Sequence, residues 1–338
     1  MRKLSIAALV LGLAACTLPS GTQRGGPVTV ATSGPIDLEA VGLGSCDGTI
    51  EVKAEGNGAG EHRFLGLRDG SLVTMAPMRV NVDGSDRAYH PTNAEAGAII
   101  HLCNAGKVYL PDGTSYHGSK SNAVCTGQFM DDVARIREAG WDDPEVGAVN
   151  WYGILGEGTA RIAGRTIRNV KPVEQRDGSG FFISPTALAD DRFREDDQRR
   201  YVDALRVSHA VVRRDSEIPL GTFGVAWRTK GCATAGRCKP IPFIVGDIGP
   251  RIGEGSVALT RAVNGLPATL DINRRNRFSG NVAGDDVMWV FFGGVKAPGP
   301  YDQAMVREKA SEAFEAWGGL SRLERCARGT DVPVAHGR

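Results

Sequence analysis

The sequence predicts a mainly β fold with a few helices, of the α+β class. Glycine is frequent, with 45 of the 338 residues, and this is typical of a chain with many turns. Apolar residues occur in many short runs bounded by Gly, Asp or Pro, which is the pattern of short strands. Helical spacing of apolar residues, in contrast, is convincing in only three segments.

Strands are expected along most of the chain. The first part holds short strand-like pieces, and alternation of apolar and polar residues from Gly153 to Val173 predicts further β-structure. A buried strand is expected at Phe181-Phe182-Ile183, ending before Pro185. The other predicted strands are Thr49 to Val52, Leu72 to Met75, Ala204 to Val212, Thr222 to Trp227, Pro240 to Val245 and Val287 to Phe292, the last two apolar enough to be central.

Three helices are predicted. Met130 to Ala139 has an apolar stripe, with Asp131 or Asp132 as its N-cap. Ser256 to Asn264 begins at a capping hydroxyl and ends before a glycine, and Tyr301 to Trp317 repeats apolar residues at core-facing positions. The charged segment from Ala187 to Arg200 is expected to be a solvated helical or loop excursion.

The first residues predict an exported lipoprotein. Residues 1–15 combine a cationic start with an apolar run too short for a stable membrane anchor, which is typical of a signal peptide. Leu13-Ala14-Ala15-Cys16 resembles the lipobox of bacterial lipoproteins, in which the cysteine becomes the lipid-bearing N-terminus. We therefore expect lipid attachment at Cys16 and a location in the bacterial cell envelope, on the outer membrane or the periplasmic face. The alternative is an ordinary secretory signal with a chance cysteine.

The rest of the chain is divided by composition. Residues 16–40 include a stretch rich in Thr, Ser, Gly and Pro, which predicts a flexible tether. We expect one large folded domain at residues 41–322 and a C-terminal tail at residues 323–338. Lys and Arg together number 40 and Asp and Glu 39, so there is no basic excess for binding nucleic acid.

Disulfide bonds are expected in an exported chain. Six cysteines besides Cys16 make an even number. Cys232 and Cys238 flank a short loop and are the first expected pair. The pairing of the other four stays open, with three combinations available among Cys46, Cys103, Cys125 and Cys326.

The most informative stretch runs from Phe243 to Ser256. In it an apolar strand is expected to deliver Asp247 into a glycine-rich turn, and Glu254 follows just before a predicted helix. One protonated and one ionised carboxyl group are what cleavage of a glycosidic bond requires. The alternative is that Asp247 stabilises a turn and Glu254 the helix start, with no chemistry at either residue.

This stretch resembles the signature of glycoside hydrolase family 75, the chitosanases. The matching residues are Gly246-Asp247-Ile248-Gly249-Pro250 and Gly253-Glu254-Gly255-Ser256. Upstream, the segments from Gly180 to Thr186 and from Tyr201 to Ala204 also resemble elements of the family. A further stretch, from Met78 to Pro91, is similar to one in related bacterial proteins. The two acids are closer in sequence here than in fungal members, and Arg251 lies in the gap.

The resemblance implies a fold, a reaction and roles. The fold would be a closed or partly closed β-barrel related to six-stranded double-psi barrels. The enzyme would hydrolyse chitosan with inversion, with Glu254 as the general acid and Asp247 activating water, their carboxyl groups standing about 6.5 to 9.5 Å apart. Such hydrolysis needs no metal and no organic cofactor.

A second cluster, Asp83, Tyr89 and His90, is expected to bind substrate, because a polar group beside an aromatic ring suits a sugar. The alternative is a loop with ordinary turn chemistry at Asp83-Gly84. The segment lacks the distal glutamate of a calcium loop, so no metal is expected there. Three further aromatic residues are expected in the core more than in a glycan groove, namely Trp141, Trp151 and Tyr152.

Together these features predict an endo-acting glycoside hydrolase for a β-1,4-linked amino-sugar polymer, with a polysaccharide as substrate and a membrane contact through its lipid. Two alternatives stay open. One is a lipoprotein that acts on peptidoglycan, and the other is a glycan-binding lipoprotein without catalysis. The sequence makes no prediction of the oligomeric state.

Overall fold

The structure is a computed structural model that describes residues 46, 64–231, 238–293 and 298–327. The chain divides into two units, Met1–Ile36 and Asp37–Arg338, and every described residue belongs to the second. Of the described residues 30% are in strands and 25% in helices, which confirms the mainly β prediction. Within these ranges, no helix combines the length and the apolar character needed to cross a membrane.

Seven strands form the main sheet, and six of them close into a ring. The order is β1-β2-β11-β8-β10-β9-β12, and a further pairing of β12 with β2 joins the two ends of the six-stranded part. This ring agrees with the partly closed barrel that the family resemblance implies. The bounds are β1 Leu65–Gly66, β2 Leu72–Asn81, β8 His209–Arg213, β9 Phe223–Arg228, β10 Ile241–Gly249, β11 Glu254–Ser256 and β12 Val282–Phe291.

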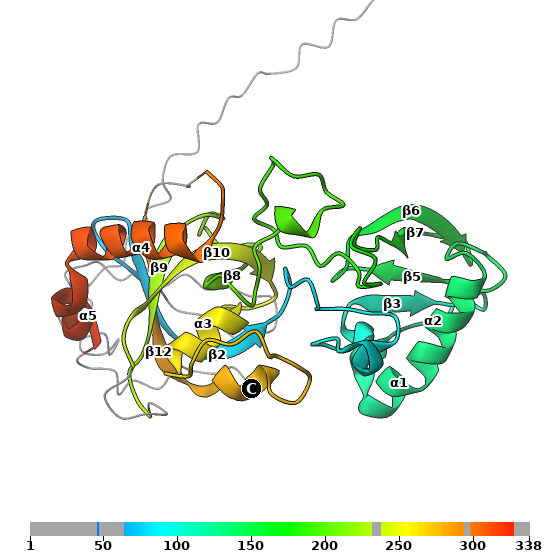
Figure 1. Cartoon of the computed structure of the whole chain (residues 1–338), viewed down its shortest axis with the longest axis horizontal. Coiled ribbons are helices and arrows are strands. Elements are labelled where there is room, and N and C mark those ends of the chain that lie inside the picture. The colour runs from blue at the N-terminus through cyan, green and yellow to red at the C-terminus, as the bar shows by residue number, and fades with distance from the viewer. Residues whose placement is uncertain (1–45, 47–63, 232–237, 294–297, 328–338) are drawn as a thin grey trace, which may run out of the picture. The chain divides into compact units, whose positions relative to one another are not determined.

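Alternation along the strands divides the apolar residues of the ring between two faces. Phe243 and Trp289 belong to the cluster inside the ring, whereas Met288 and Val290 pack outside it with Trp317. Helix α4, Gln303–Trp317, packs on strands β9 and β10 (Figure 1), and helix α5, Gly319–Ala327, follows it. Helix α3, Val257–Val263, begins directly after β11, with the Ser256 hydroxyl accepting the Leu259 N–H as its cap.

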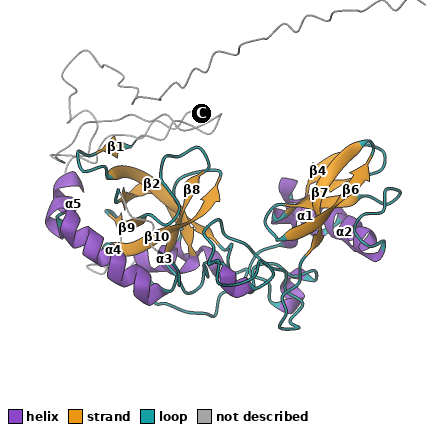
Figure 2. Cartoon of the chain, turned by 90° about the horizontal axis from the view of Figure 1, so that it is seen from above, coloured by secondary structure: helices purple, strands orange, loops and turns teal. Residues whose placement is uncertain are grey.

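Between β2 and β8 the chain forms further β-structure. Strands β3 (Gly106–Tyr109), β4 (Ser115–His117) and β5 (Ala148–Trp151) make a sheet, and β6 (Gly156–Ile162) and β7 (Arg165–Pro172) make a hairpin, near helices α1 (Asn122–Thr126) and α2 (Gln128–Glu138) (Figure 2). Within the described ranges, the short 3-10 helices are η2 Asn93–Ala96, η3 Leu102–Asn104, η4 Gly118–Lys120, η5 Gln198–Arg200 and η6 Arg277–Gly280.

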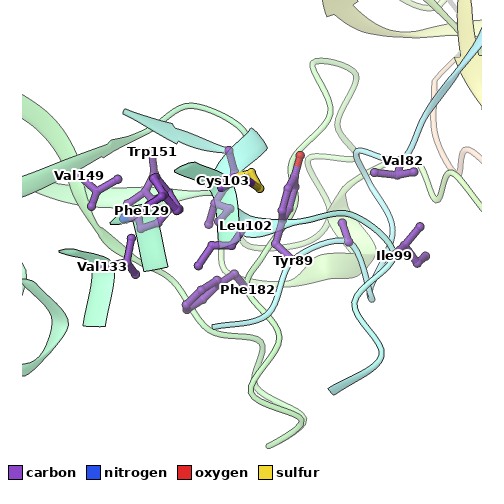
Figure 3. Close-up of a cluster of buried hydrophobic side chains, with 14 of the residues drawn as sticks. Val82, Tyr89, Ile99, Leu102, Cys103, Phe129, Val133, Val149, Trp151 and Phe182 are labelled. Carbon is purple, nitrogen blue, oxygen red and sulfur yellow. A yellow bond between two sulfur atoms is a disulfide. The ribbon is translucent and has the colours of Figure 1, made fainter. Parts of the chain in front are cut away.

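A core cluster around Trp151 fills this part of the chain. Figure 3 shows Trp151 with Phe129, Val133 and Val149, while the hydroxyl of Tyr89 points away from Phe182. The indole N–H of Trp151 donates to the Val170 carbonyl at 3.1 Å. Trp151 is therefore a core residue, as expected.

Several predicted boundaries need correction. The predicted helix at 130–139 begins earlier, and its N-cap is Gly127, so the prediction of Asp131 or Asp132 as the cap was wrong. Phe182 is buried, but it forms an isolated bridge with Glu174 and not a strand, because the pairing does not extend beyond the hydrogen bonds of Phe181 and Ile183. Strand β8 begins at His209, because residues 204–208 form turns and an irregular approach. The predicted strand Thr49 to Val52 lies outside the described residues.

Two disulfides are present among the described cysteines. Cys103 pairs with Cys125, and Cys46 pairs with Cys326 across 280 residues of sequence. Cys238 is also disulfide-bonded, whereas Cys232, its expected partner, lies outside the described residues. Because Cys326 and Leu323 are buried in α5, the fold continues past the boundary expected at residue 322. Cys16 and residues 1–40 are likewise outside the described part.

Candidate functional site

Asp247 and Glu254 flank the same central strand, β8. Asp247 in β10 pairs with Val211 from one side, and Glu254 at the start of β11 pairs with Val211 from the other. Residues paired across neighbouring strands place their side chains on one face of a sheet. The two carboxylates therefore share a face with Val211 between them, and their Cα atoms are two strand spacings, or about 10 Å, apart.

This face is the outer face of the ring. Ala210 and Val212 belong to the core cluster inside the ring, so Val211 between them points outward. Glu254 pairs on its other side with Arg79 of β2, an exposed residue. The outer face thus carries one row of side chains across four strands. Their order is Asp247, Val211, Glu254 and Arg79.

A β-bulge turns Asp247 to this outer face. Val245 points into the ring, and strict alternation would turn Asp247 inward as well. The register shifts between these two residues, which leaves Gly246 as the extra residue. A Cβ atom at position 246 would lie 2.8 Å from the Cβ atom of His209, so glycine is required. Asp247 thus lies within β10, and the prediction that it lies in a turn after the strand was wrong.

Asp247 is almost fully buried, with 8% of its surface exposed. Its Oδ1 atom accepts the backbone N–H of Ala187 at 2.8 Å. Burial raises the pKa of Asp247 to about 7, with a further contribution from the negative charge of Asp83. Burial therefore favours the protonated form of this carboxyl group.

Glu254 has a different charge environment. The Arg251 Nε atom lies 3.0 Å from its Oε1 atom, and 14% of the Glu254 side chain is exposed. Burial raises the pKa of Glu254, and the guanidinium of Arg251 opposes this rise. The negative charge of Asp83 raises the pKa further, whereas the positive charge of Arg79 lowers it. Glu254 therefore has two cationic neighbours that stabilise its ionised form.

Asp83 belongs to the same group of acids. It follows β2, and its Oδ1 atom accepts the Tyr89 hydroxyl at 3.0 Å, while its backbone N–H donates to the Asn81 side chain at 2.8 Å. Burial raises the pKa of Asp83 to about 6, against hydrogen bonds from Tyr89, Asn81 and Ser184. Because Asp83 raises the pKa of both Asp247 and Glu254, the site contains three interacting carboxyl groups.

One loop, at residues 184–187, forms hydrogen bonds with both Asp83 and Asp247. The Ser184 side chain bonds to the Asp83 carboxylate and accepts the Gly84 N–H at 3.3 Å. Three residues later, Ala187 donates its N–H to Asp247. Ser184 lies in the Gly180 to Thr186 segment of the family resemblance, so sequence comparison could have suggested it. The role of Ala187 is carried by its backbone, for which no residue type gives a signal.

His90 lies in other surroundings. Its Nδ1 atom is 2.9 Å from the Thr92 hydroxyl, and its ring packs edge-on against Phe181 at 4.9 Å between centroids. Burial lowers the pKa of His90, and Arg137 and Glu174 are its charged neighbours. The structure thus brings together Asp247, Glu254, Asp83 and Tyr89, whereas the side chain of His90 contacts Thr92 and Phe181.

Trp141 and Tyr152 differ in their exposure. Trp141 packs on Trp151 with 6.0 Å between ring centroids, as part of the core. Tyr152, in contrast, is 51% exposed, and it lies close enough to Tyr89 to contribute to the raised pKa of that residue. Of the three aromatic residues considered, Tyr152 is therefore the one whose ring a ligand can reach near the acids.

A cavity of about 960 Å³ opens beside Gly84, the neighbour of Asp83 in the chain. Its three arginines are each ion-paired to one of its aspartates. With six aspartates, its lining has an excess of three negative charges. The lining consists of Gly84, Asp86, Gln175, Arg176, Asp177, Asp196, Asp197, Gln198, Arg199, Tyr201, Asp203, Arg206, Val207, Tyr301, Asp302 and Gln303.

One group of metal-ligand types occurs in the described part of the chain, formed by His101, Cys103 and Cys125. The two sulfur atoms are joined in a disulfide, so they do not provide the thiolates that bind zinc. This group also lies outside the acidic site.

Comparison with models of protein families finds no match to this chain, and comparison with curated proteins finds none either.

Proposed function

We propose that this protein is an endo-acting, chitosanase-like glycoside hydrolase that cleaves a β-1,4-linked amino-sugar polymer with inversion. The observation that carries the proposal is the placement of Asp247 and Glu254 on either side of Val211, on one outer face of the ring. One carboxyl group would protonate the departing oxygen and the other would activate a water molecule.

The spacing of the two acids supports an inverting reaction. Their Cα atoms are about 10 Å apart, and the side chains stand on the same face. From that distance two carboxyl groups reach the separation of about 6.5 to 9.5 Å that leaves room for a water molecule beside the sugar. The raised pKa values of Asp247 and Glu254 also suit a site that must hold one proton near neutral pH.

The cavity next to Gly84 supports a cationic substrate. Its excess of three negative charges would attract the ammonium groups of a deacetylated amino-sugar chain. Tyr201 and Tyr301 in the lining offer aromatic surface for sugar rings. None of the three acids lines this cavity, and Gly84, next to Asp83 in the chain, is its link to them.

The proposal includes a lipid anchor at Cys16 in the cell envelope, supported by the lipobox resemblance of Leu13-Ala14-Ala15-Cys16. Cells that express the wild-type chain and are fed a labelled fatty acid should yield labelled protein in the membrane fraction. A Cys16→Ser variant should carry no label. If the wild-type chain carries none either, the anchor is excluded, whatever the activity of the domain.

The activity is tested on three polymers: chitosan, fully acetylated chitin and peptidoglycan. Chitosan should be cleaved, and NMR of the first products should show the inverted anomer. Asp247→Asn and Glu254→Gln should each lower the rate by about a hundredfold or more. Asp112→Asn, an equal change at an exposed aspartate, should leave the rate unchanged.

Each other outcome has a defined meaning. Cleavage of peptidoglycan alone would replace the substrate, and retained activity in both acid variants would exclude the proposed site. Binding of glycans by a protein that cleaves none of the three polymers would identify a glycan-binding lipoprotein instead.

A further inference from the structure

Three acids, rather than two, share the site, and they differ in their hydrogen-bond donors. Asp83 accepts the Tyr89 hydroxyl at 3.0 Å and the Asn81 amide at 3.5 Å, and bonds to the Ser184 side chain. These three partners are side chains that surround one carboxylate. Hydrogen bonds of this kind favour the ionised form of the group that accepts them.

Asp247 has fewer donors. It accepts backbone N–H groups from Ala187, at 2.8 Å, and Ile248, and with 8% exposure it has little contact with water. Asp83 is the acid that acts on it most strongly. When two nearby carboxyl groups share one proton, the proton resides on the one with the weaker support for its charge.

We propose that Asp83 is a positioning residue that holds the proton of the site on Asp247, so that Asp247 is the general acid and Glu254 the base. This reverses the roles that the family resemblance implies. The roles rest on the proposed function, whereas the location of the proton does not.

The charged groups around each acid agree with this division. Asp247 faces Asp83 and Glu254, which both oppose its ionisation. Glu254 faces the cations Arg251 and Arg79 in addition to Asp83. Its ion pair with Arg251 therefore favours the ionised form of Glu254, the form that a base needs.

The reaction then balances as follows. Asp247 gives its proton to the glycosidic oxygen as the bond between this oxygen and the anomeric carbon breaks. A water molecule attacks the anomeric carbon from the other side and gives a proton to Glu254. The sum is the addition of one water molecule, and solvent returns the two acids to their starting protonation. Asp83 exchanges no proton with the sugar.

The location of the proton can be measured without substrate. We would label the full chain with ¹³C at the aspartate side-chain carboxyl groups and titrate it by NMR. The Asp247 signal is the one that disappears in Asp247→Asn, and in the wild type it should titrate near pH 7. In Asp83→Asn its midpoint should fall by about one pH unit or more, since a negative neighbour is lost. Asp112→Asn should leave the midpoint in place.

Tyr89→Phe is a second variant that keeps Asp83 but removes one donor to it. Here the midpoint of Asp83 should rise and that of Asp247 should fall, because the proton moves toward Asp83. A purely structural role for Tyr89 would not produce these opposite shifts. If the Asp247 midpoint is unchanged in both Asp83→Asn and Tyr89→Phe, the proposed location of the proton is wrong.

The roles are tested by the pH dependence of kcat/KM on chitosan. Asp83→Asn should move the basic limb to lower pH, since that limb reports loss of the proton from the acid. Movement of the acidic limb alone would make Asp247 the base and overturn the role assignment. A protein that cleaves no polymer would refute the proposed function, while the NMR titration would still decide where the proton resides.

Discussion

Glu254 is ion-paired with Arg251, whose Nε atom lies 3.0 Å from its Oε1 atom. The two residues are three positions apart, and Gly253 between them has a φ of +88°. A Cβ atom on Gly253 would lie 2.7 Å from the Pro77 carbonyl oxygen. The turn thus places the guanidinium of Arg251 next to Glu254, the first residue of β11. The backbone of the turn passes close to Pro77 in β2.

Removal of this cation should raise the pKa of Glu254. In Arg251→Gln the carboxylate of Glu254 loses the cation that is ion-paired with it. Burial and the negative charge of Asp83, which both raise its pKa, remain. The acidic limb of kcat/KM should therefore move to higher pH. Arg165→Gln, at an exposed arginine of β7, serves as the control. An unchanged acidic limb in Arg251→Gln would show that Glu254 does not control it.

Gly249→Ala should disturb the face that carries Asp247 and Glu254 directly. The new Cβ atom would lie 2.7 Å from Val211 Cγ1 and 3.3 Å from Glu254 Oε2, so both residues must move. We expect a loss of about 1 to 3 kcal/mol in the free energy of unfolding and at least a tenfold loss of activity. Gly284→Ala is the control, because the atom nearest to its new Cβ is the end of the Asp286 side chain, which can move. This variant should change neither the free energy of unfolding nor the activity. Wild-type activity in Gly249→Ala would mean that this row of side chains tolerates displacement.

Asp247→Asn should make the fold more stable at high pH. The pKa of Asp247 is about 7 in the folded chain against an ordinary value of 3.8, so its stabilising effect is fully present below pH 3.8 and is lost as the pH rises through 7. The variant does not suffer this loss. Between pH 4 and pH 8, urea denaturation should show its advantage over the wild type grow by on the order of 3 kcal/mol. A constant difference would exclude the raised pKa.

His209 should weaken the fold in acid. It is fully buried, and among the residues that the structure describes neither ring nitrogen has a hydrogen-bond partner. Burial lowers its pKa to about 4, so the stability present above pH 6.5 is lost as the pH falls toward 4. His209→Leu should remove this loss in a series of thermal unfolding curves, and His117→Leu, at an exposed histidine, should not. If His209→Leu and the wild type lose stability equally in acid, His209 is not the cause of the loss.

The two disulfides should differ in their effect on stability. The Cys46–Cys326 bond closes 280 residues and the Cys103–Cys125 bond 22. In the chain-entropy model, the longer loop contributes about 5 kcal/mol and the shorter about 3 kcal/mol. Replacing both cysteines of a pair with serine should therefore lower the denaturation midpoint more for the first pair. The reverse order would show that packing around Cys103 and Cys125 outweighs loop closure.

Local patterns predicted the elements of the fold well. The capping hydroxyl of Ser256 and the apolar runs of β10 and β12 gave elements that the structure contains. The N-cap of α2 was predicted incorrectly because the helix begins at a glycine without a side-chain cap. Helix α5 was not predicted, although its buried residues Gly319, Leu323 and Cys326 recur at helical spacing. The sequence does not show that Cys326 is bonded to Cys46, 280 positions away.

The candidate acids were predictable, but their arrangement was not. A motif with two acids and several glycines pointed to Asp247 and Glu254, whereas the bulge at Gly246 that turns Asp247 outward is visible only in the pairing with β8. Asp83 was predicted as a substrate-binding residue from its aromatic neighbour. Its relation to Asp247 depends on the fold of a loop about 100 residues further along, which no local pattern encodes.

Because Asp247 and Glu254 are both positioned by Val211, the gap between them is a property of the backbone ladder and not of the connecting peptide. Residues can be inserted into or removed from the connection between β10 and β11 at Pro250 and Arg251 without widening or narrowing the gap between the two carboxyl groups, provided that both strands keep their hydrogen bonds to β8. Natural or designed variants with connections of different length should therefore produce the same anomer.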